Sequence, residues 1–91
     1  MPTAQTDVVV LNRLGLHARP AMAFVDVANG FESDVRVHKG SQAVDGKSIM
    51  QMMILAATQG TELVIKADGP DADDALAALS QLFADRFNEE E

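Results

Sequence analysis

The pattern of apolar and polar positions predicts four strands. Residues 7–12 are mostly β-branched and apolar, which is typical of a buried strand. Residues 34–38 and 61–67 alternate between apolar and polar side chains, as strands with one buried face do. A short further strand is predicted near residues 42–45, after a hairpin turn.

Three other segments, residues 18–29, 48 to about 57 and 71–87, are predicted to be helices. In the first, apolar residues recur at the i, i+3, i+4 and i+7 spacing of one helix face. The last has an apolar face and a first turn rich in Asp, which suits the helix dipole. Four strands with one apolar face need a cover, and three amphipathic helices can supply it. The order βαββαβα therefore predicts an α+β open-faced sandwich, a four-stranded and mostly antiparallel sheet covered on one face by three helices.

Length and composition bound the class of protein. The chain of 91 residues predicts a single domain over 1–91, with a core from about residue 6 to residue 87. An apolar content of 47% is normal for a folded domain, and the lack of cysteine excludes disulfides and thiolate metal sites. No segment resembles a signal peptide, and no apolar run approaches the roughly 20 residues of a membrane helix. We therefore expect a cytoplasmic protein that does not insert into membranes.

The charge distribution separates the two halves of the chain. A net charge of −7 argues against nucleic-acid binding. The acidity lies at the C-terminal end, however, where eight acidic residues from Asp68 onward accompany Arg86 alone. Residues 13–47 carry five basic and four acidic residues. The first half of the chain can therefore still receive an anion.

His17 lies where the first loop ends and the first predicted helix begins. At such a helix start, the unpaired backbone N–H groups and the helix dipole favour a negative charge. Arg19 adds a planar, permanently charged group suited to phosphate oxygens, and Pro20 leaves no N–H unpaired in the first turn. A neutral imidazole can attack phosphorus without a separate general base. These residues predict an anion site with His17 as its nucleophile.

The alternative is that His17 is an incidental loop residue, as a lone histidine near a helix start usually is. Arg19, Pro20 and the preceding Gly-Leu argue against this alternative, although their spacing alone leaves the question open. His38 shows the contrast, because it falls on the polar face of a strand beside Lys39 and is expected to be solvated. No third ligand stands at usable spacing from the two histidines, so no metal site is predicted.

Ser48 begins the second predicted helix. Ser48 and Gln51 fit a capping box, S-x-x-Q, in which the hydroxyl accepts from the backbone at the third helical position. The same serine is also a candidate for phosphorylation, because a phosphate is tolerated at a helix N-terminus and Lys47 is adjacent. Most capping serines are not modified, so the spacing itself supports only the cap.

The second predicted helix is apolar on more than one side. If Met52 and Leu55 face the sheet, then Ile49, Met50 and Met53 face outward. The alternative is that all of them belong to the core. A short helix that is apolar all round in a small domain usually contacts a partner, and methionine adapts to more than one.

Three runs of sequence carry a family resemblance. They are Leu14-Gly15-Leu16-His17-Ala18-Arg19-Pro20-Ala21, Gly46-Lys47-Ser48-Ile49-Met50 and Thr58-Gln59-Gly60-Thr61-Glu62-Leu63. In these runs, and in matching order from about Thr6 to Phe87, the chain resembles the HPr family of bacterial phosphocarrier proteins. The first run is highly specific, and the second is independently typical of the family.

The resemblance implies the same βαββαβα sandwich and a role as a phosphoryl carrier rather than an enzyme, without a cofactor. It implies that His17 receives phosphate from Enzyme I, itself charged by phosphoenolpyruvate, and passes it to IIA components of sugar transporters. Arg19 would steady the phosphoryl group, and Ser48 matches the serine that HPr kinase/phosphorylase modifies with ATP. The implied docking surface consists of Met22, Lys47, Ile49, Met50 and Met53. We expect a monomer.

Other functions stay open at this stage. The run Asn12-Arg13-Leu14-Gly15 is longer than in family members with Asn-Gly before Leu-His, and with Met22 it is also similar to the nitrogen-related NPr branch, a regulatory relay. A second alternative is a regulatory module that acts through phosphorylated Ser48 on a transcription factor or enzyme. A third is a binding domain for a small ligand, or an autonomous enzyme using His17, but no acid partner stands near that histidine.

Overall fold

The computed structural model describes residues 3–88. The elements are β1 (Thr3–Val9), α1 (Ala18–Ala28), β2 (Asp34–Lys39), β3 (Gln42–Asp45), α2 (Ile49–Ile54), β4 (Glu62–Asp68), α3 (Ala72–Ala84) and the short turn η1 (Arg86–Asn88). This is the predicted order βαββαβα, followed by one extra turn.

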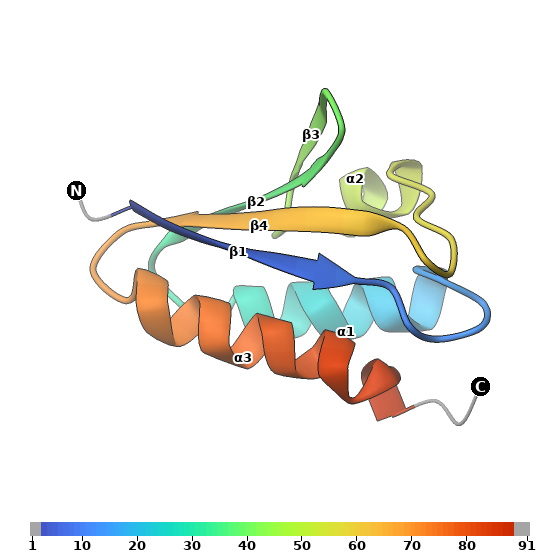
Figure 1. The fold of residues 1–91 in the computed structure, drawn as a ribbon. Coiled ribbons are helices and arrows are strands. Elements are labelled where there is room, and N and C mark those ends of the chain that lie inside the picture. Colours follow the sequence, from blue (N-terminus) through green and yellow to red (C-terminus); the bar gives the residue numbers. More distant parts are fainter. Residues whose placement is uncertain (1–2, 89–91) are drawn as a thin grey trace.

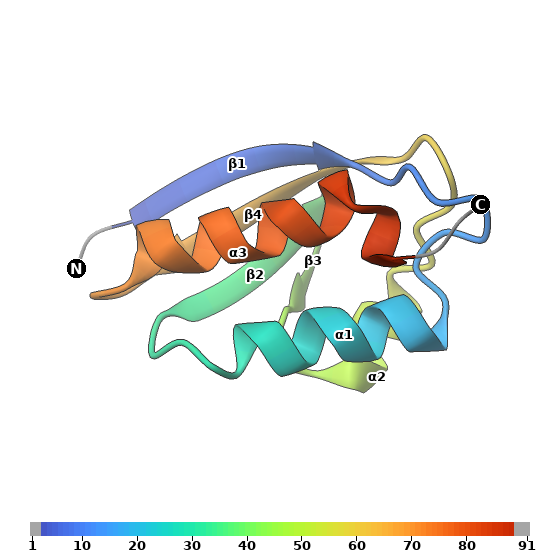
Figure 2. The same ribbon diagram turned by 90° about the horizontal axis from the view of Figure 1, so that it is seen from below.

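The four strands form one sheet in the order β1-β4-β2-β3, and every neighbouring pair is antiparallel. α1 and α3 lie side by side beneath one face of the sheet (Figures 1 and 2). α2 packs against α1 and β3. Within residues 3–88 no helix covers the opposite face of the sheet (Figure 1), so the predicted open-faced α+β sandwich is confirmed.

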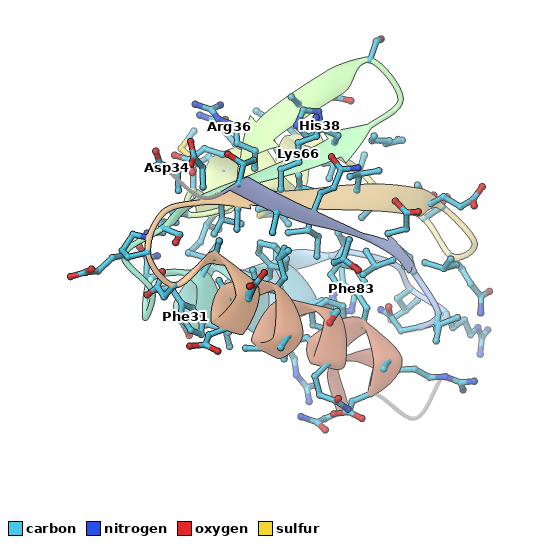
Figure 3. All side chains as sticks on the ribbon, turned by 60° about the vertical axis from the view of Figure 1, so that its left-hand side comes forward. Phe31, Asp34, Arg36, His38, Lys66 and Phe83 are labelled. Atoms are coloured by element: carbon cyan, nitrogen blue, oxygen red, sulfur yellow. The ribbon has the colours of Figure 1, made fainter. Side chains whose placement is uncertain are left out.

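Strand alternation divides the two faces of the sheet as predicted. The inward residues are buried: Val8, Val35, Val37, Val44, Leu63, Ile65 and Ala67. The outer face carries polar and charged side chains from neighbouring strands, among them Arg36, His38 and Lys66 (Figure 3). Because the helices cover the apolar face alone, the outer face is the polar side of the molecule.

An aromatic group packs between the helices and the sheet. The ring of Phe83 on α3 meets the ring of Phe24 on α1 edge to face, with centroids 6.0 Å apart. The ring of Phe87 meets Phe83 in the same way at 4.9 Å. These contacts fix the spacing of α1 and α3 and draw the chain after α3 back onto the core.

Several predicted boundaries were wrong. β1 spans Thr3–Val9 rather than residues 7–12, and its first residues form a strand because they pair with Asp68, Ala67 and Lys66 of β4. α2 ends at Ile54 rather than near residue 57, because Ala56 adopts a positive φ of 50° that breaks the helix.

α3 also ends early, at Ala84 rather than residue 87. Arg86, Phe87 and Asn88 all have positive φ angles, between 54° and 62°, so the chain turns with the opposite hand. This turn places the Phe87 ring on Phe83 and leaves it only 6% exposed. A continuous helix pattern could not reveal the reversal, because Phe87 also fits the apolar face of a longer helix.

Candidate functional site

His17 occupies the N-cap of α1, as predicted. Its backbone is extended, with φ −79° and ψ −171°, and its carbonyl accepts the first helical hydrogen bond from the Ala21 N–H at 3.0 Å. The His17 side chain is half-buried and makes no capping hydrogen bond to the first turn. The N–H groups of Ala18 and Arg19, which open the helix, therefore lie at the same helix end as the imidazole.

The loop before His17 is fixed by its backbone. The Leu16 N–H donates to the Ala57 carbonyl at 2.8 Å, and the Leu16 side chain is buried. Gly15 has a φ of +71°, and any side chain there would collide with the Ala57 carbonyl oxygen. Glycine is thus required at position 15 both for its backbone conformation and for the close approach.

Asn12 closes the turn that precedes Gly15. Its side-chain amide donates to the Gly15 carbonyl at 2.6 Å, and the Gly15 N–H donates to the Asn12 carbonyl at 3.1 Å. Asn12 is fully buried. This role of Asn12 was not predicted from the sequence, although asparagine at the first and glycine at the fourth position are typical of a type I turn.

Charge at the start of α1 favours an anion. Arg19 is exposed in the first turn, which contains no acidic residue. Pro20 is buried in the same turn. The first turn of α3, by contrast, carries Asp73 and Asp74. Of these two helix starts, the one beside His17 combines the positive end of the helix dipole with a basic side chain.

Ser48 is the N-cap of α2, as predicted. Its hydroxyl accepts from the Gln51 N–H at 3.2 Å. The second half of the capping box is different, because Gln51 Oε1 accepts from the Asp45 N–H at 2.8 Å and not from the backbone of Ser48. Gln51 therefore connects α2 to the end of β3.

Lys47 does not direct its amino group at Ser48. Its Nζ donates to the Phe31 carbonyl at 2.7 Å, in the segment that follows α1. Its backbone N–H donates to Asp45 Oδ1 at 2.9 Å. The side chain is half-buried in this position.

The apolar residues of α2 divide as predicted. Met52 and Leu55 are completely buried, while Ile49, Met50 and Met53 are exposed. Met22 is exposed on α1, which packs against α2. Four further exposed apolar residues were not predicted, Leu14 at 69%, Ile54 at 65%, and Val9 and Leu11 at 40% each, because none follows from helical spacing alone. The large exposed apolar side chains among residues 3–88 are therefore Val9, Leu11, Leu14, Met22, Ile49, Met50, Met53 and Ile54.

His38 lies apart from His17, on the uncovered face of the sheet (Figure 3). It faces a shallow hollow that is also lined by Asp7 and Glu62. Among residues 3–88, no group of three His, Cys, Asp or Glu side chains is placed to hold a metal ion. The structure does not bring the two histidines together.

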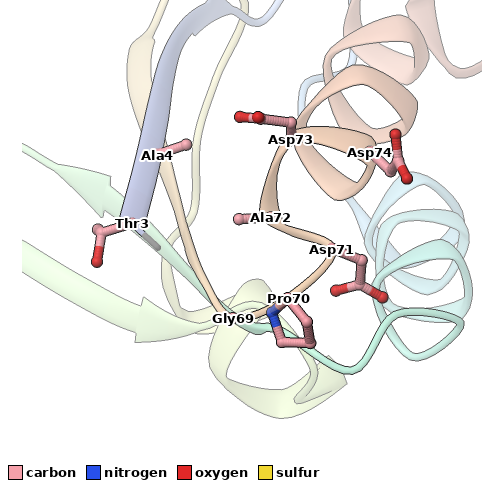
Figure 4. A pocket seen from close by; sticks show the side chains of 8 residues that line it. All are labelled: Thr3, Ala4, Gly69, Pro70, Asp71, Ala72, Asp73 and Asp74. Atoms are coloured by element: carbon pink, nitrogen blue, oxygen red, sulfur yellow. The ribbon is translucent and has the colours of Figure 1, made fainter. Parts of the chain in front are cut away.

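Another hollow, of about 390 Å³, lies beside the start of α3 (Figure 4). Asp71 on its rim accepts from the Ser33 N–H and the Glu32 N–H, both at 2.9 Å, and from the Ser33 hydroxyl at 2.5 Å. The Ser33 hydroxyl bond, and then the bond from the Glu32 N–H, lower the pKa of Asp71. With Asp73 and Asp74 also lining it, this hollow is acidic and unsuited to a phosphate.

Comparison with known proteins identifies the family. The family described as "PTS HPr component phosphorylation site" matches residues 4–85. The phosphocarrier protein HPr of Pseudomonas aeruginosa is 46% identical over 86 residues, which cover 93% of this chain and 96% of that protein. The chain belongs to the HPr family, and it is a phosphocarrier protein of the phosphotransferase system.

Solved structures agree with this assignment. The crystal structure of HPr from Thermoanaerobacter tengcongensis superimposes with a TM-score of 0.93 at 39% identity, covering 97% of this chain and 99% of that one. A structure described as an HPr dimer from the same organism has a TM-score of 0.77 at 41% identity, covering 88% and 92% of the two chains. The fold around His17 is thus the fold of experimentally determined HPr proteins.

The helices of residues 3–88 are too short or too polar to span a membrane.

Proposed function

We propose that the protein accepts a phosphoryl group on His17 from phospho-Enzyme I and passes it to IIA components of sugar transporters. The observation that carries this proposal is the position of His17 at the N-cap of α1 in a chain of the HPr family. Phosphoenolpyruvate would charge Enzyme I first. The protein acts as a carrier between two enzymes and needs no cofactor of its own.

The chemistry follows from the geometry of the helix start. A ring nitrogen of neutral His17 attacks phosphorus, and the N–P bond forms as the bond between phosphorus and the donor breaks. The negative charge on the phosphoryl oxygens develops beside the first-turn N–H groups and the exposed guanidinium of Arg19. Such transfer depends mainly on positioning and charge stabilisation. In the second transfer, a nucleophile of the acceptor attacks the same phosphorus, and the N–P bond to His17 breaks.

The test is phosphorylation with phosphoenolpyruvate and Enzyme I. We expect one acid-labile phosphoryl group per chain, lost in His17→Ala and retained in His38→Ala. His38 is the matched control because the chain has only two histidines and His38 lies on the uncovered face. Undiminished labelling of His17→Ala would contradict the proposal.

We further propose that Met22, Lys47, Ile49, Met50 and Met53 belong to the surface that docks Enzyme I and the IIA components. Four of these side chains are apolar and exposed on two helices that pack together. Exposed apolar side chains gathered in this way favour contact with a partner. Three of the five residues lie on α2, whose N-cap is Ser48, so one partner would meet both features.

Phosphorylation of Ser48 by an HPr kinase/phosphorylase is the regulatory part of the proposal. Ser48 is half-buried at a helix start, where a phosphate is electrostatically tolerated. Incubation with purified kinase and ATP should label the wild type and not Ser48→Ala. Absence of label in the wild type would overturn this part while leaving transfer through His17 intact.

The branch and the oligomeric state complete the proposal. We propose a role in sugar uptake rather than in an NPr-type nitrogen relay. Comparing the rates of phosphate transfer to a sugar-specific IIA and to a nitrogen-type IIA would decide between the two roles. We propose that the chain works as a monomer in the cytoplasm. Light scattering at micromolar concentration tests the monomer, which matters because one relative has been solved as a dimer.

A further inference from the structure

The helix α2 has little of its own to hold it in place. It spans only Ile49–Ile54, far fewer residues than an isolated helix needs in water. Met52 is its one buried residue, and Leu55 follows as a buried C-cap. Most of its apolar side chains face solvent. Contacts other than core packing must therefore fix where α2 lies.

One such contact lies before the helix. Lys47 Nζ donates to the Phe31 carbonyl at 2.7 Å. Phe31 follows α1, and its side chain packs against the core. The half-buried Lys47 ammonium therefore ties the turn before Ser48 to the end of the neighbouring helix.

A second contact of this kind lies at the opposite end. Lys39 Nζ donates to the Leu55 carbonyl at 3.1 Å. Lys39 is the last residue of β2 and pairs with Gln42 of β3 at the end of the hairpin. Lysine at a helix C-terminus bonds the last carbonyls and interacts favourably with the negative end of the helix dipole. The β2–β3 hairpin thus anchors the end of α2.

We infer that Lys39 and Lys47 are positioning residues that clamp the two ends of α2. Each ammonium group reaches a backbone carbonyl across 16 residues of sequence and joins α2 to a different neighbour, Lys39 to the sheet and Lys47 to α1. The clamp holds Ser48 and the exposed methionines in one arrangement relative to His17. In naming α2 as a docking helix, this inference rests on the proposed function. It changes the expected role of Lys47, which acts through α2 more than through direct contact.

The test removes one amino group at a time. Lys39→Met and Lys47→Met keep an unbranched side chain and lose the donor. We expect the Leu55 and Ala56 N–H groups, which bond to Gln51 and Met53, to exchange with solvent about tenfold faster or more. The amides of β4 should exchange as in the wild type. Lys39→Arg, which keeps a cationic donor, should restore most of the protection.

A kinetic measurement distinguishes positioning from mere structure. In Lys39→Met, the KM for Enzyme I should rise several-fold while kcat stays unchanged, because His17 and Arg19 are untouched. Lys66→Met is the matched control: it removes the same charge from the uncovered face of the sheet, and both measurements should stay at wild-type values.

Two results would overturn the clamp. One is wild-type exchange of the α2 amides in both methionine variants. The other is equally fast exchange in α2 and β4, which would show global unfolding. The exchange measurement needs no partner protein. A wild type that takes no phosphate would therefore refute the proposed function and leave the clamp to be judged on its own.

Discussion

The connecting segments at the two ends of the molecule are held together by different kinds of hydrogen bond. At the site end, formed by residues 10–17 and 55–61, the chain segments are joined mainly through backbone bonds, such as Leu16 N–H to the Ala57 carbonyl. At the distal end, formed by residues 29–33 and 68–72, the Asp71 carboxylate gathers three donors from Glu32 and Ser33. The site end therefore keeps its side chains available, while the distal end uses its side chains to close the structure.

Exposure follows the same division. Leu14 is 69% exposed at the site end, and Met50 is 76% exposed on the neighbouring α2. None of the large, exposed apolar side chains among residues 3–88 lies at the distal end. Exposed apolar area of this kind contributes nothing to folding stability and is typical of a binding surface. Under the proposed function, stability and binding thus depend on different ends of the molecule, and substitutions can separate them.

The largest effect is expected for Gly15→Ala at the site end. A positive φ costs an alanine about 1–2 kcal/mol, and the new methyl group would displace the loop from the Ala57 carbonyl. Because a displacement of about 1 Å can cost on the order of 100-fold in rate, phosphoryl uptake by His17 should fall steeply. Thermal unfolding and the rate of labelling measure the two parts.

Gly40→Ala is the matched control for that substitution. Gly40 also has a positive φ, +58°, but a side chain there meets nothing within 4 Å. Its strain should therefore lower Tm without changing the rate of phosphoryl uptake. If both variants transfer phosphate equally fast, the close approach of Gly15 to Ala57 is not what positions His17.

Met50→Ser should affect binding and not stability. Removing this exposed side chain should raise the KM for Enzyme I about tenfold, equivalent to about 1.4 kcal/mol, with Tm unchanged. Val9→Ser is the control, since Val9 is also partly exposed but lies on β1. Equal values of KM in the two variants would show that α2 is not the docking surface.

Asp71→Asn should affect stability and not transfer. Hydrogen bonds from Ser33 and Glu32 hold the pKa of Asp71 below its ordinary value. A depressed pKa in the folded state stabilises the fold above the unfolded pKa of about 3.9, and this contribution is lost as the pH falls through the folded pKa. The variant should be less stable than the wild type above about pH 4, and the two should converge in stronger acid.

Thermal unfolding across the pH range measures this difference. Asp74→Asn serves as control, because Asp74 is exposed in the first turn of α3. At neutral pH, below the unfolding temperature, Asp71→Asn should still take up phosphate at the wild-type rate. A gap in stability that persists unchanged at low pH would mean that the carboxylate charge is not responsible.

The smallest effect is expected for Ala56→Gly at the site end, and it has the opposite sign. Ala56 has a φ of 50° and an exposed methyl group. Glycine at position 56 relieves the backbone strain of the positive φ, but its greater flexibility in the unfolded chain offsets part of this gain. The net effect should be to stabilise the fold by up to about 1 kcal/mol. In Ala77→Gly, within α3, glycine should instead destabilise by a similar amount. A lower Tm for Ala56→Gly than for the wild type would refute the claim that the positive φ of Ala56 strains the fold.

Features with local causes could be predicted from the sequence. The inward valines of β2 follow from strict alternation, and the N-cap positions of His17 and Ser48 follow from residues within one helical turn. The α+β sandwich follows from the order of such elements. The position of His17 at a helix start could therefore be predicted before the structure was known.

Features set by distant contacts could not be predicted. The early start of β1 depends on pairing with β4, about 60 residues away in the chain. The early end of α2 goes with the positive φ of Ala56, next to the Ala57 carbonyl that accepts from Leu16. The bonds of Lys39 and Lys47 join residues 16 apart, which no periodicity encodes. Arg86 and its neighbours reverse hand where Phe87 packs on Phe83.

The uncovered face of the sheet offers a site for attaching a label. Gln5 lies on it, paired with Lys66 in the neighbouring strand, and is exposed. The chain contains no cysteine, so Gln5→Cys would introduce a unique thiol for a fluorophore or a surface linkage. A molecule attached there would present its helices to solution. Encounters with successive phosphorylation partners could then be followed one molecule at a time.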